Sequence, residues 1–146
     1  FPPLLSPLLV HRIGKGTKMV LTGFTGPYVM PDDISSRTEH LVHVCAGSGS
    51  VPNLSMIKHA LANEMKLRHT LIYSNKTWRD VIFRNVLLDL QNEFPGRLRV
   101  VHALTRETEA QGNGADVELG RVNEAMLRKH IPDSDAAEFF VVTPGI

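Results

Sequence analysis

The 146-residue sequence contains a single cysteine, Cys45, so no disulfide can form within the chain. A chain without disulfides is typical of the cytoplasm, which is the compartment we expect. The formal net charge is only +1, whereas dedicated nucleic-acid-binding domains carry a clear basic excess. No apolar run approaches the ~20 residues that a membrane-spanning helix needs. Neither a nucleic acid nor a membrane is therefore expected as a partner.

The sequence also lacks the residue spacing of a metal site. His40 and His43 are three residues apart on an expected strand, so their side chains point to opposite faces and cannot bind one metal ion together. Cys45 ends an apolar run, and we expect it to be a small buried side chain rather than a reactive thiol. We therefore expect no metal.

The sequence does contain one marked signal, the segment HLVHVCAGSGSVP at residues 40–52. An apolar alternating strand breaks into Gly47, Ser48 and Gly49 just before a segment with helical spacing. Glycines let an anion approach the main chain, and the N–H groups at a helix start bind it. Pro52 stands where the dinucleotide fingerprint has its third glycine, so the pattern is incomplete. Both a pyrophosphate-binding turn and a plain strand–turn–helix junction stay open.

Hydrophobic periodicity predicts alternating strands and helices along most of the chain. The expected strands are residues 18–22, 40–45, 70–73, 97–104 and 139–142, and the expected helices are residues 52–65, 78–94 and 117–130. This alternation predicts an α/β fold, with an open parallel five-stranded sheet and helices on both faces. Ligands of such sheets bind at the carboxyl ends of the strands. The expected rim therefore consists of residues 46–50, 74–77, 105–108 and 143–145.

The second rim segment bears on the kind of dinucleotide. NAD sites commonly end the second strand in an acid that binds the ribose 2′-hydroxyl, but Ser74, Asn75 and Lys76 stand here instead. Thr105 and Arg106 add a hydroxyl and a guanidinium. Such groups suit a 2′-phosphate, because Arg binds phosphate bidentately and Lys acts as a point charge. The alternative is that they are ordinary solvated loop residues.

Five motifs together resemble the ferredoxin–NADP reductase superfamily, in that family's order, from about residue 18 to residue 146. They are GFTGPYVMP at residues 23–31, CAGSGSVPNLS at 45–55, TLIYSNKTWRDVIF at 70–83, VVHALTRE at 100–107 and FFVVTPGI at 139–146. In the family these correspond to the interdomain link, the pyrophosphate loop, the second strand with its helix, the third strand and the Cys-Gly-Pro region. Each motif is weak singly, but their order is specific.

The resemblance implies the NAD(P)H-binding module of a flavin-dependent reductase. Such an enzyme passes electrons from NAD(P)H through FAD to a ferredoxin, an iron–sulfur domain or an oxygenase component. It implies NADPH as the cofactor, with NADH as the alternative, and FAD in the intact protein. The residues implied to bind the dinucleotide are Gly47, Ser48, Gly49, Ser50, Pro52, Ser74, Asn75, Lys76, Thr105, Arg106, Thr143, Pro144 and Gly145. The catalytic residues stay unassigned.

The resemblance also implies a division of the chain. Residues 1–36 would be the end of an all-β flavin-binding barrel with its linker, and residues 37–146 an NAD(P)H-binding domain truncated at its last strand. The family's Arg-x-Tyr-Ser/Thr flavin motif is absent, so we expect the chain alone to be inactive. Val142 and Thr143 replace the family's Cys-Gly near the nicotinamide. A non-catalytic nucleotide-binding or regulatory domain of the same fold therefore remains the alternative.

Overall fold

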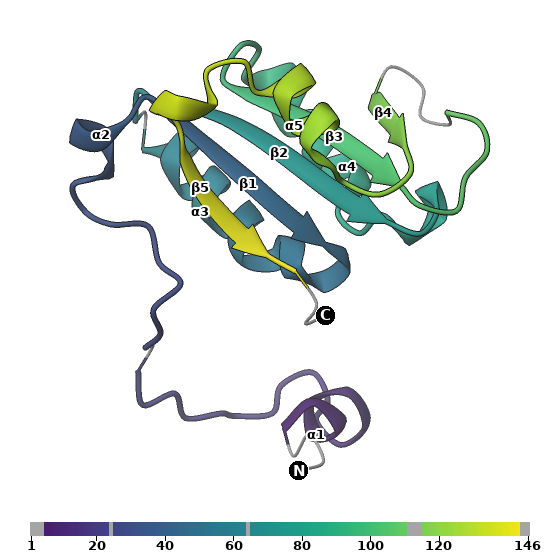
Figure 1. The fold of residues 1–146 in the computed structure, drawn as a ribbon. Coiled ribbons are helices and arrows are strands. Elements are labelled where there is room, and N and C mark those ends of the chain that lie inside the picture. Colours follow the sequence, from purple (N-terminus) through teal and green to yellow (C-terminus); the bar gives the residue numbers. More distant parts are fainter. Residues whose placement is uncertain (1–4, 24, 64, 111–114, 144–146) are drawn as a thin grey trace.

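The computed structural model describes residues 5–23, 25–63, 65–110 and 115–143. Its centre is a five-stranded sheet in the order β4-β3-β2-β1-β5, in which every paired neighbour runs parallel (Figure 1). The strands are β1 (His40–Ala46), β2 (Arg68–Asn75), β3 (Leu98–Leu104), β4 (Asp116–Leu119) and β5 (Glu138–Val142). The expected α/β fold with an open parallel sheet is thus confirmed.

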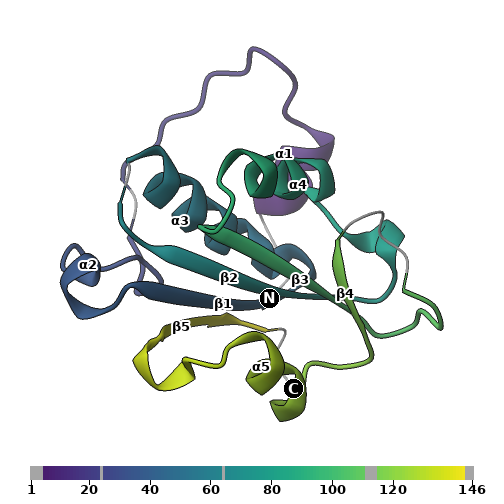
Figure 2. The same ribbon diagram turned by 90° about the horizontal axis from the view of Figure 1, so that it is seen from above.

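Helices cover both faces of the sheet, as Figure 2 shows from above. The α-helices are α1 (Leu5–His11), α2 (Ile34–Arg37), α3 (Ser50–Ala62), α4 (Arg84–Glu93) and α5 (Glu124–His130); the short 3-10 helices are η1 (Gly47–Gly49), η2 (Trp78–Asp80) and η3 (Ser134–Ala136). On one face, Ile57 of α3 and Leu87 of α4 pack against Leu71 of β2. On the other, Met126 of α5 packs against Ile72. Burial on both faces explains why β1 to β3 read as nearly continuous apolar runs.

The structure corrects one expected strand near the start of the chain. Residues 18–22 form no strand, and Val20 and Leu21 are exposed. Alternating apolar residues form a stable strand only where a neighbouring strand accepts their backbone hydrogen bonds, and this segment pairs with no strand of the sheet. The fifth strand is instead β4, within the region expected to be helical.

The expected helices 78–94 and 117–130 are each shorter than predicted. Thr77 and Asp80 form a reciprocal capping box at the start of η2, the chain becomes extended at Val81, and Phe83 then adopts a left-handed φ of 59° before α4 begins. In the second region, β4 pairs with β3, and Gly120 turns the chain at φ +100°. The Asn123 side chain accepts from the Met126 N–H at 2.9 Å and so caps α5. Local capping divides segments whose periodicity looked continuous.

Three buried histidines lie on one face of the sheet. His43, His69 and His102 are 0%, 2% and 1% exposed. Burial penalises the charged imidazolium and lowers the pKa of His43 to about 4, of His69 to about 3 and of His102 to about 4. All three are therefore neutral in the folded protein at neutral pH.

These pKa shifts predict that acid destabilises the fold. The unfolded chain takes up protons near the ordinary histidine pKa of about 6.5, whereas the folded chain does not, so the free energy of unfolding falls as pH drops from about 7 to about 4.5. Each imidazole contributes at most about 1.4 kcal/mol per pH unit. Urea denaturation across this pH range measures the slope.

The variant His102→Leu tests one member of the set. It removes a buried Nδ1 that has no hydrogen-bond partner within the described residues, and it should flatten the slope by about 1 kcal/mol per pH unit. The variant His59→Ala provides the control for the loss of one histidine, because His59 is exposed and lies outside this buried set. An unaltered slope in His102→Leu would mean that this imidazole titrates normally in the folded state.

Candidate functional site

The glycine turn at the end of β1 forms the start of a long helical segment. Gly47 has a φ of +51°, a left-handed conformation that favours glycine. The 3-10 helix η1 leads directly into the 13-residue α3, and the Ser50 N–H bonds back to the carbonyls of Gly47 and Ser48. The first N–H groups of a helix have no partner within it, and the helix dipole adds positive charge there. The turn is therefore suited to bind an anion.

Side chains beneath the turn hold its carbonyls toward the core. The buried Tyr73 hydroxyl donates to the Gly47 carbonyl at 3.0 Å, and the Ser50 hydroxyl donates to the same oxygen at 3.0 Å. The Asn53 Nδ2 donates to the Gly49 carbonyl at 3.2 Å. Because a peptide unit is planar, the inward Gly47 carbonyl directs the N–H of Ser48 to the opposite side of the turn.

Gly49 is required for a different reason, the close approach of the turn to β5. A Cβ at this position would lie 2.9 Å from Val142 Cγ1 and 3.0 Å from the Val142 carbonyl oxygen. No side chain fits there without displacing the end of β5. Gly49 thus brings the turn against Val142, with Thr143 following at the same edge of the sheet.

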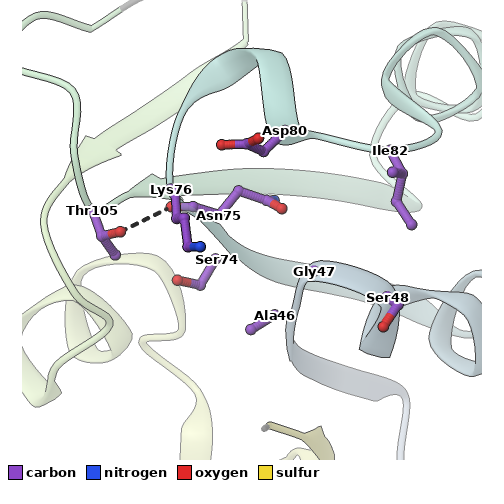
Figure 3. Close-up of a pocket in the computed structure, with 9 residues that line it drawn as sticks. All are labelled: Ala46, Gly47, Ser48, Ser74, Asn75, Lys76, Asp80, Ile82 and Thr105. Carbon is purple, nitrogen blue, oxygen red and sulfur yellow. Dashed lines mark hydrogen bonds between the residues drawn. The ribbon is translucent and has the colours of Figure 1, made fainter.

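A pocket opens beside the turn, over the carboxyl ends of β1 and β2 (Figure 3). Its volume is about 490 Å³. It is lined by Ala46, Gly47, Ser48, Ser74, Asn75, Lys76, Asp80, Ile82 and Thr105. The loop after β3 is joined to the end of β2, because the Thr105 hydroxyl donates to the Asn75 carbonyl at 3.3 Å and the Arg106 N–H to the Lys76 carbonyl at 2.8 Å. Three separate loops therefore meet at one site.

The residues expected at the site fall into four groups. Those lining the pocket are Gly47, Ser48, Ser74, Asn75, Lys76 and Thr105. Gly49, Ser50 and Pro52 belong to the turn and the first turn of α3 but lie outside the pocket lining. Arg106 is exposed beside the pocket, and Thr143 follows β5. Pro144 and Gly145 lie outside the described residues.

The pocket contains an acid that sequence reasoning missed. Asp80 comes from η2, not from the end of β2, and Figure 3 shows it above Lys76. Hydrogen bonds from Thr77 hold the pKa of the Asp80 carboxyl below its ordinary value, and the charges of Lys76 and Arg106 lower it further. Both Thr77 bonds end on Oδ2, which leaves Oδ1 available as an acceptor. The Thr77-x-x-Asp80 spacing of a capping box was the available signal.

The other expectations for this region concern Cys45 and metals. Cys45 is 1% exposed, and burial raises the pKa of its thiol to about 12. It is a buried apolar side chain, as expected, because the reactive thiolate does not form at neutral pH. Among the residues that the structure describes, no three His, Cys, Asp or Glu side chains come together as metal ligands.

The sequence profile of the oxidoreductase NAD-binding domain family matches residues 43–144. The chain belongs to this family. The matched region begins within β1 and includes the glycine turn, the pocket and β5. The resemblance to the ferredoxin–NADP reductase superfamily, which rested on five ordered motifs, is thereby confirmed.

This NAD-binding domain matches a part of each of several known proteins. The NADH-cytochrome b5 reductase 2 of Danio rerio is 28% identical over 117 residues, which cover 76% of this chain and 37% of that protein. The cytochrome b5 reductase domain of Ulva prolifera nitrate reductase superimposes with a TM-score of 0.64 at 19% identity, over 73% of this chain and 39% of that one. The ferredoxin NADP⁺ reductase of Neisseria gonorrhoeae, with bound FAD and NADP, gives a TM-score of 0.55 at 23% identity, over 73% and 43%. The chain thus spans well under half the length of these relatives.

The close contact at Gly49 gives a direct test of the turn in this NAD-binding domain. Gly49→Ala should lower the free energy of unfolding by about 1–3 kcal/mol, because the added methyl group overlaps Val142. Gly14→Ala is the matched control, since a Cβ at Gly14 meets nothing within 4 Å. Urea denaturation of both variants measures the difference. Equal stability of the two would show that the turn can move away from β5 at little cost.

Proposed function

We propose that this chain is the NAD(P)H-binding module of a flavin-dependent reductase, in which electrons pass from NAD(P)H through FAD to a redox partner. The observation that carries the proposal is that the glycine turn forms one side of the pocket. The turn offers N–H groups for a pyrophosphate, and the pocket beside it offers hydroxyl, amide and charged groups for a ribose. The matched family and the reductases among the relatives support the same function.

Each expected site residue has a proposed task in this module. Gly47, Ser48 and Gly49, with Ser50 and Pro52 in the following turn, bind and orient the pyrophosphate. Ser74, Asn75, Lys76, Thr105 and Arg106 surround the adenosine ribose, and Thr143, Pro144 and Gly145 border the nicotinamide. A bound nicotinamide would supply a hydride to the flavin, and the part of this chain is to position the nicotinamide. Val142 supports that end by packing on Gly49.

The choice between NADPH and NADH depends on three charged side chains. Lys76 and Arg106 favour a 2′-phosphate, whereas the Asp80 carboxylate repels it and can accept a hydrogen bond from a free 2′-hydroxyl. The sequence indicated NADPH because Asp80 was not placed at the site. The Danio rerio relative is named for NADH. We propose that both dinucleotides bind and that the balance of these three charges sets their ratio.

Substitution of these side chains tests the proposed site. Arg106→Ala should weaken NADPH binding by roughly tenfold or more and NADH binding by no more than about threefold, because only the former loses a charge-assisted contact. Asp80→Asn should shift the ratio in the opposite direction, toward NADPH. Calorimetric titration of the chain with each dinucleotide gives the dissociation constants.

The control for these variants is Arg79→Ala, which removes an exposed arginine of η2 that does not line the pocket. It should change neither dissociation constant by more than about twofold, because solvent and salt screen an exposed charge outside the pocket. If Arg106→Ala weakened both dinucleotides equally, Arg106 would not be a 2′-phosphate ligand.

A second test separates the reductase from the alternative, a non-catalytic nucleotide-binding domain. In the intact protein, NADPH or NADH should bleach the absorbance of a bound flavin under anaerobic conditions. Absence of bleaching by both dinucleotides, with binding retained, would favour the alternative, for which Val142 and Thr143 in place of Cys-Gly are the reason.

The remaining parts of the proposal concern the intact protein. We propose that residues 1–36 lead from a flavin-binding barrel into the NAD(P)H-binding domain of residues 37–146. A ferredoxin, an iron–sulfur domain or an oxygenase component would accept the electrons. No helix in the described part of the chain combines the length and apolar character needed to cross a bilayer. A cytoplasmic location, favoured by the single cysteine, remains part of the proposal.

A further inference from the structure

A buried side-chain amide joins three separate parts of the chain directly behind the glycine turn. Asn53, in the first turn of α3, is 0% exposed. Its Oδ1 accepts from the Tyr28 hydroxyl at 2.8 Å and lies 3.0 Å from His43 Nδ1 of β1. Its Nδ2 donates to the Gly49 carbonyl at 3.2 Å. Asn53 thus connects the segment before α2, strand β1 and the turn.

The hydrogen bonds around Asn53 have only one consistent direction. Because Oδ1 can only accept, His43 must carry its proton on Nδ1, and its Nε2 then accepts from His69 Nδ1 at 3.1 Å. This series of hydrogen bonds from Asn53 through His43 ends at His69 Nε2, which is buried without a hydrogen-bond partner in the described part of the chain. The rings of Phe140, His43 and His69 stack at centroid distances of 5.6 and 5.4 Å. Neither the tautomers nor the amide can rearrange without leaving another buried group unpaired.

Tyr28 is the member of this hydrogen-bond network that lies on an irregular segment of the chain. It belongs to the segment between residues 25 and 33, which forms no helix or strand, and it is only partly buried. Its ring packs edge-on against Phe140 at 5.9 Å. Its hydroxyl is the link between this segment and Asn53, so withdrawal of the segment removes one of the two donors that hold the amide oxygen.

We propose that Tyr28 and Asn53 are positioning residues that couple the docking of the segment before α2 to the conformation of the glycine turn, and thereby to the affinity for the dinucleotide pyrophosphate. That the ligand is a dinucleotide rests on the proposed function. The coupling itself rests on the hydrogen bonds of Asn53 to Tyr28, His43 and Gly49. Because coupling between sites is reciprocal, dinucleotide binding in turn stabilises the docked segment. Since residues 1–36 are proposed to lead from the flavin-binding part, affinity would respond to the position of that part.

Tyr28→Phe tests the coupling, because it removes only the hydroxyl and keeps the ring against Phe140. We expect the dissociation constants for NADH and NADPH to rise by the same factor, roughly threefold to tenfold, because both share the pyrophosphate. In the chain without ligand, NMR should show a displaced ¹³C resonance of the Gly49 carbonyl and displaced amide resonances of Ser48 and Ser50. Ser55→Ala, which removes an exposed hydroxyl bonded only within α3, should displace none of them.

A double-mutant cycle identifies the route of the effect. If Tyr28 acts through Asn53, the double variant Tyr28→Phe/Asn53→Ala should bind no more weakly than Asn53→Ala alone. A merely structural role for Tyr28 would lower the free energy of unfolding while leaving the Gly49 resonance and both dissociation constants unchanged, and this result would overturn the inference. Additive losses in the cycle would also overturn it.

The same experiments distinguish a failure of this inference from a failure of the proposed function. If the unsubstituted chain bound neither NADH nor NADPH, the proposed function would fail for this chain, while the Gly49 resonance would still report the coupling. A displaced resonance then supports the link from Tyr28 to the turn, and an undisplaced one refutes it. If both dinucleotides bind but Tyr28→Phe changes the dissociation constant of only one, Tyr28 and Asn53 do not act on the binding of the shared pyrophosphate.

Discussion

The candidate site depends on the hydrogen bonds that hold the carbonyl groups of the glycine turn toward the core. Tyr73 and Ser50 bind the Gly47 carbonyl from below, and Asn53 binds that of Gly49. A peptide unit is planar, with its C=O and N–H on opposite sides, so the inward Gly47 carbonyl turns the N–H of Ser48 outward. The position follows from topology: the chain proceeds from β1 to β2 and β3 on one side, then crosses to β5 on the other. The turn lies where that direction reverses, which is where parallel sheets bind ligands.

The proposed anion site therefore depends more on backbone N–H groups than on the net charge of the chain. The chain carries a formal charge of only +1, and the cations beside the pocket, Lys76 and Arg106, face the carboxylate of Asp80. Charges that offset one another contribute little to overall affinity but distinguish ligands that differ by one phosphate. In the proposed site, N–H groups at the turn would bind the pyrophosphate of either dinucleotide, whereas the side chains at the ribose end would set the selectivity between them. Affinity and selectivity thus have separate physical origins within one pocket.

Local signals predicted much of the fold and long-range contacts account for the errors. The three central strands were predictable because burial on both faces makes them continuously apolar. β4 was missed because it is a short edge strand whose Asp116–Leu119 sequence carries no strand signal without its partner β3. The break before α4 depends on a positive φ at Phe83, which no residue-type preference indicates. Residues 18–22 show the converse, a strand pattern without a neighbour to pair with.

The residues of the candidate site likewise fall into those that the sequence predicted and those that only the structure showed. Gly47 and Gly49 were found because glycine marks a backbone requirement, and the structure supplies one for each: a left-handed φ and a close approach to Val142. Tyr73, Asn53 and Asp80 were missed because their residue types are ordinary and their roles arise only from proximity after folding. A sequence motif records the residues whose chemistry cannot be replaced at a position. The residues that hold a motif in place come from other elements, where many side chains could reach the same atom. For this chain the glycine turn that we propose as the phosphate site was therefore readable from the sequence, whereas the presence of Asp80 in the pocket beside it was not.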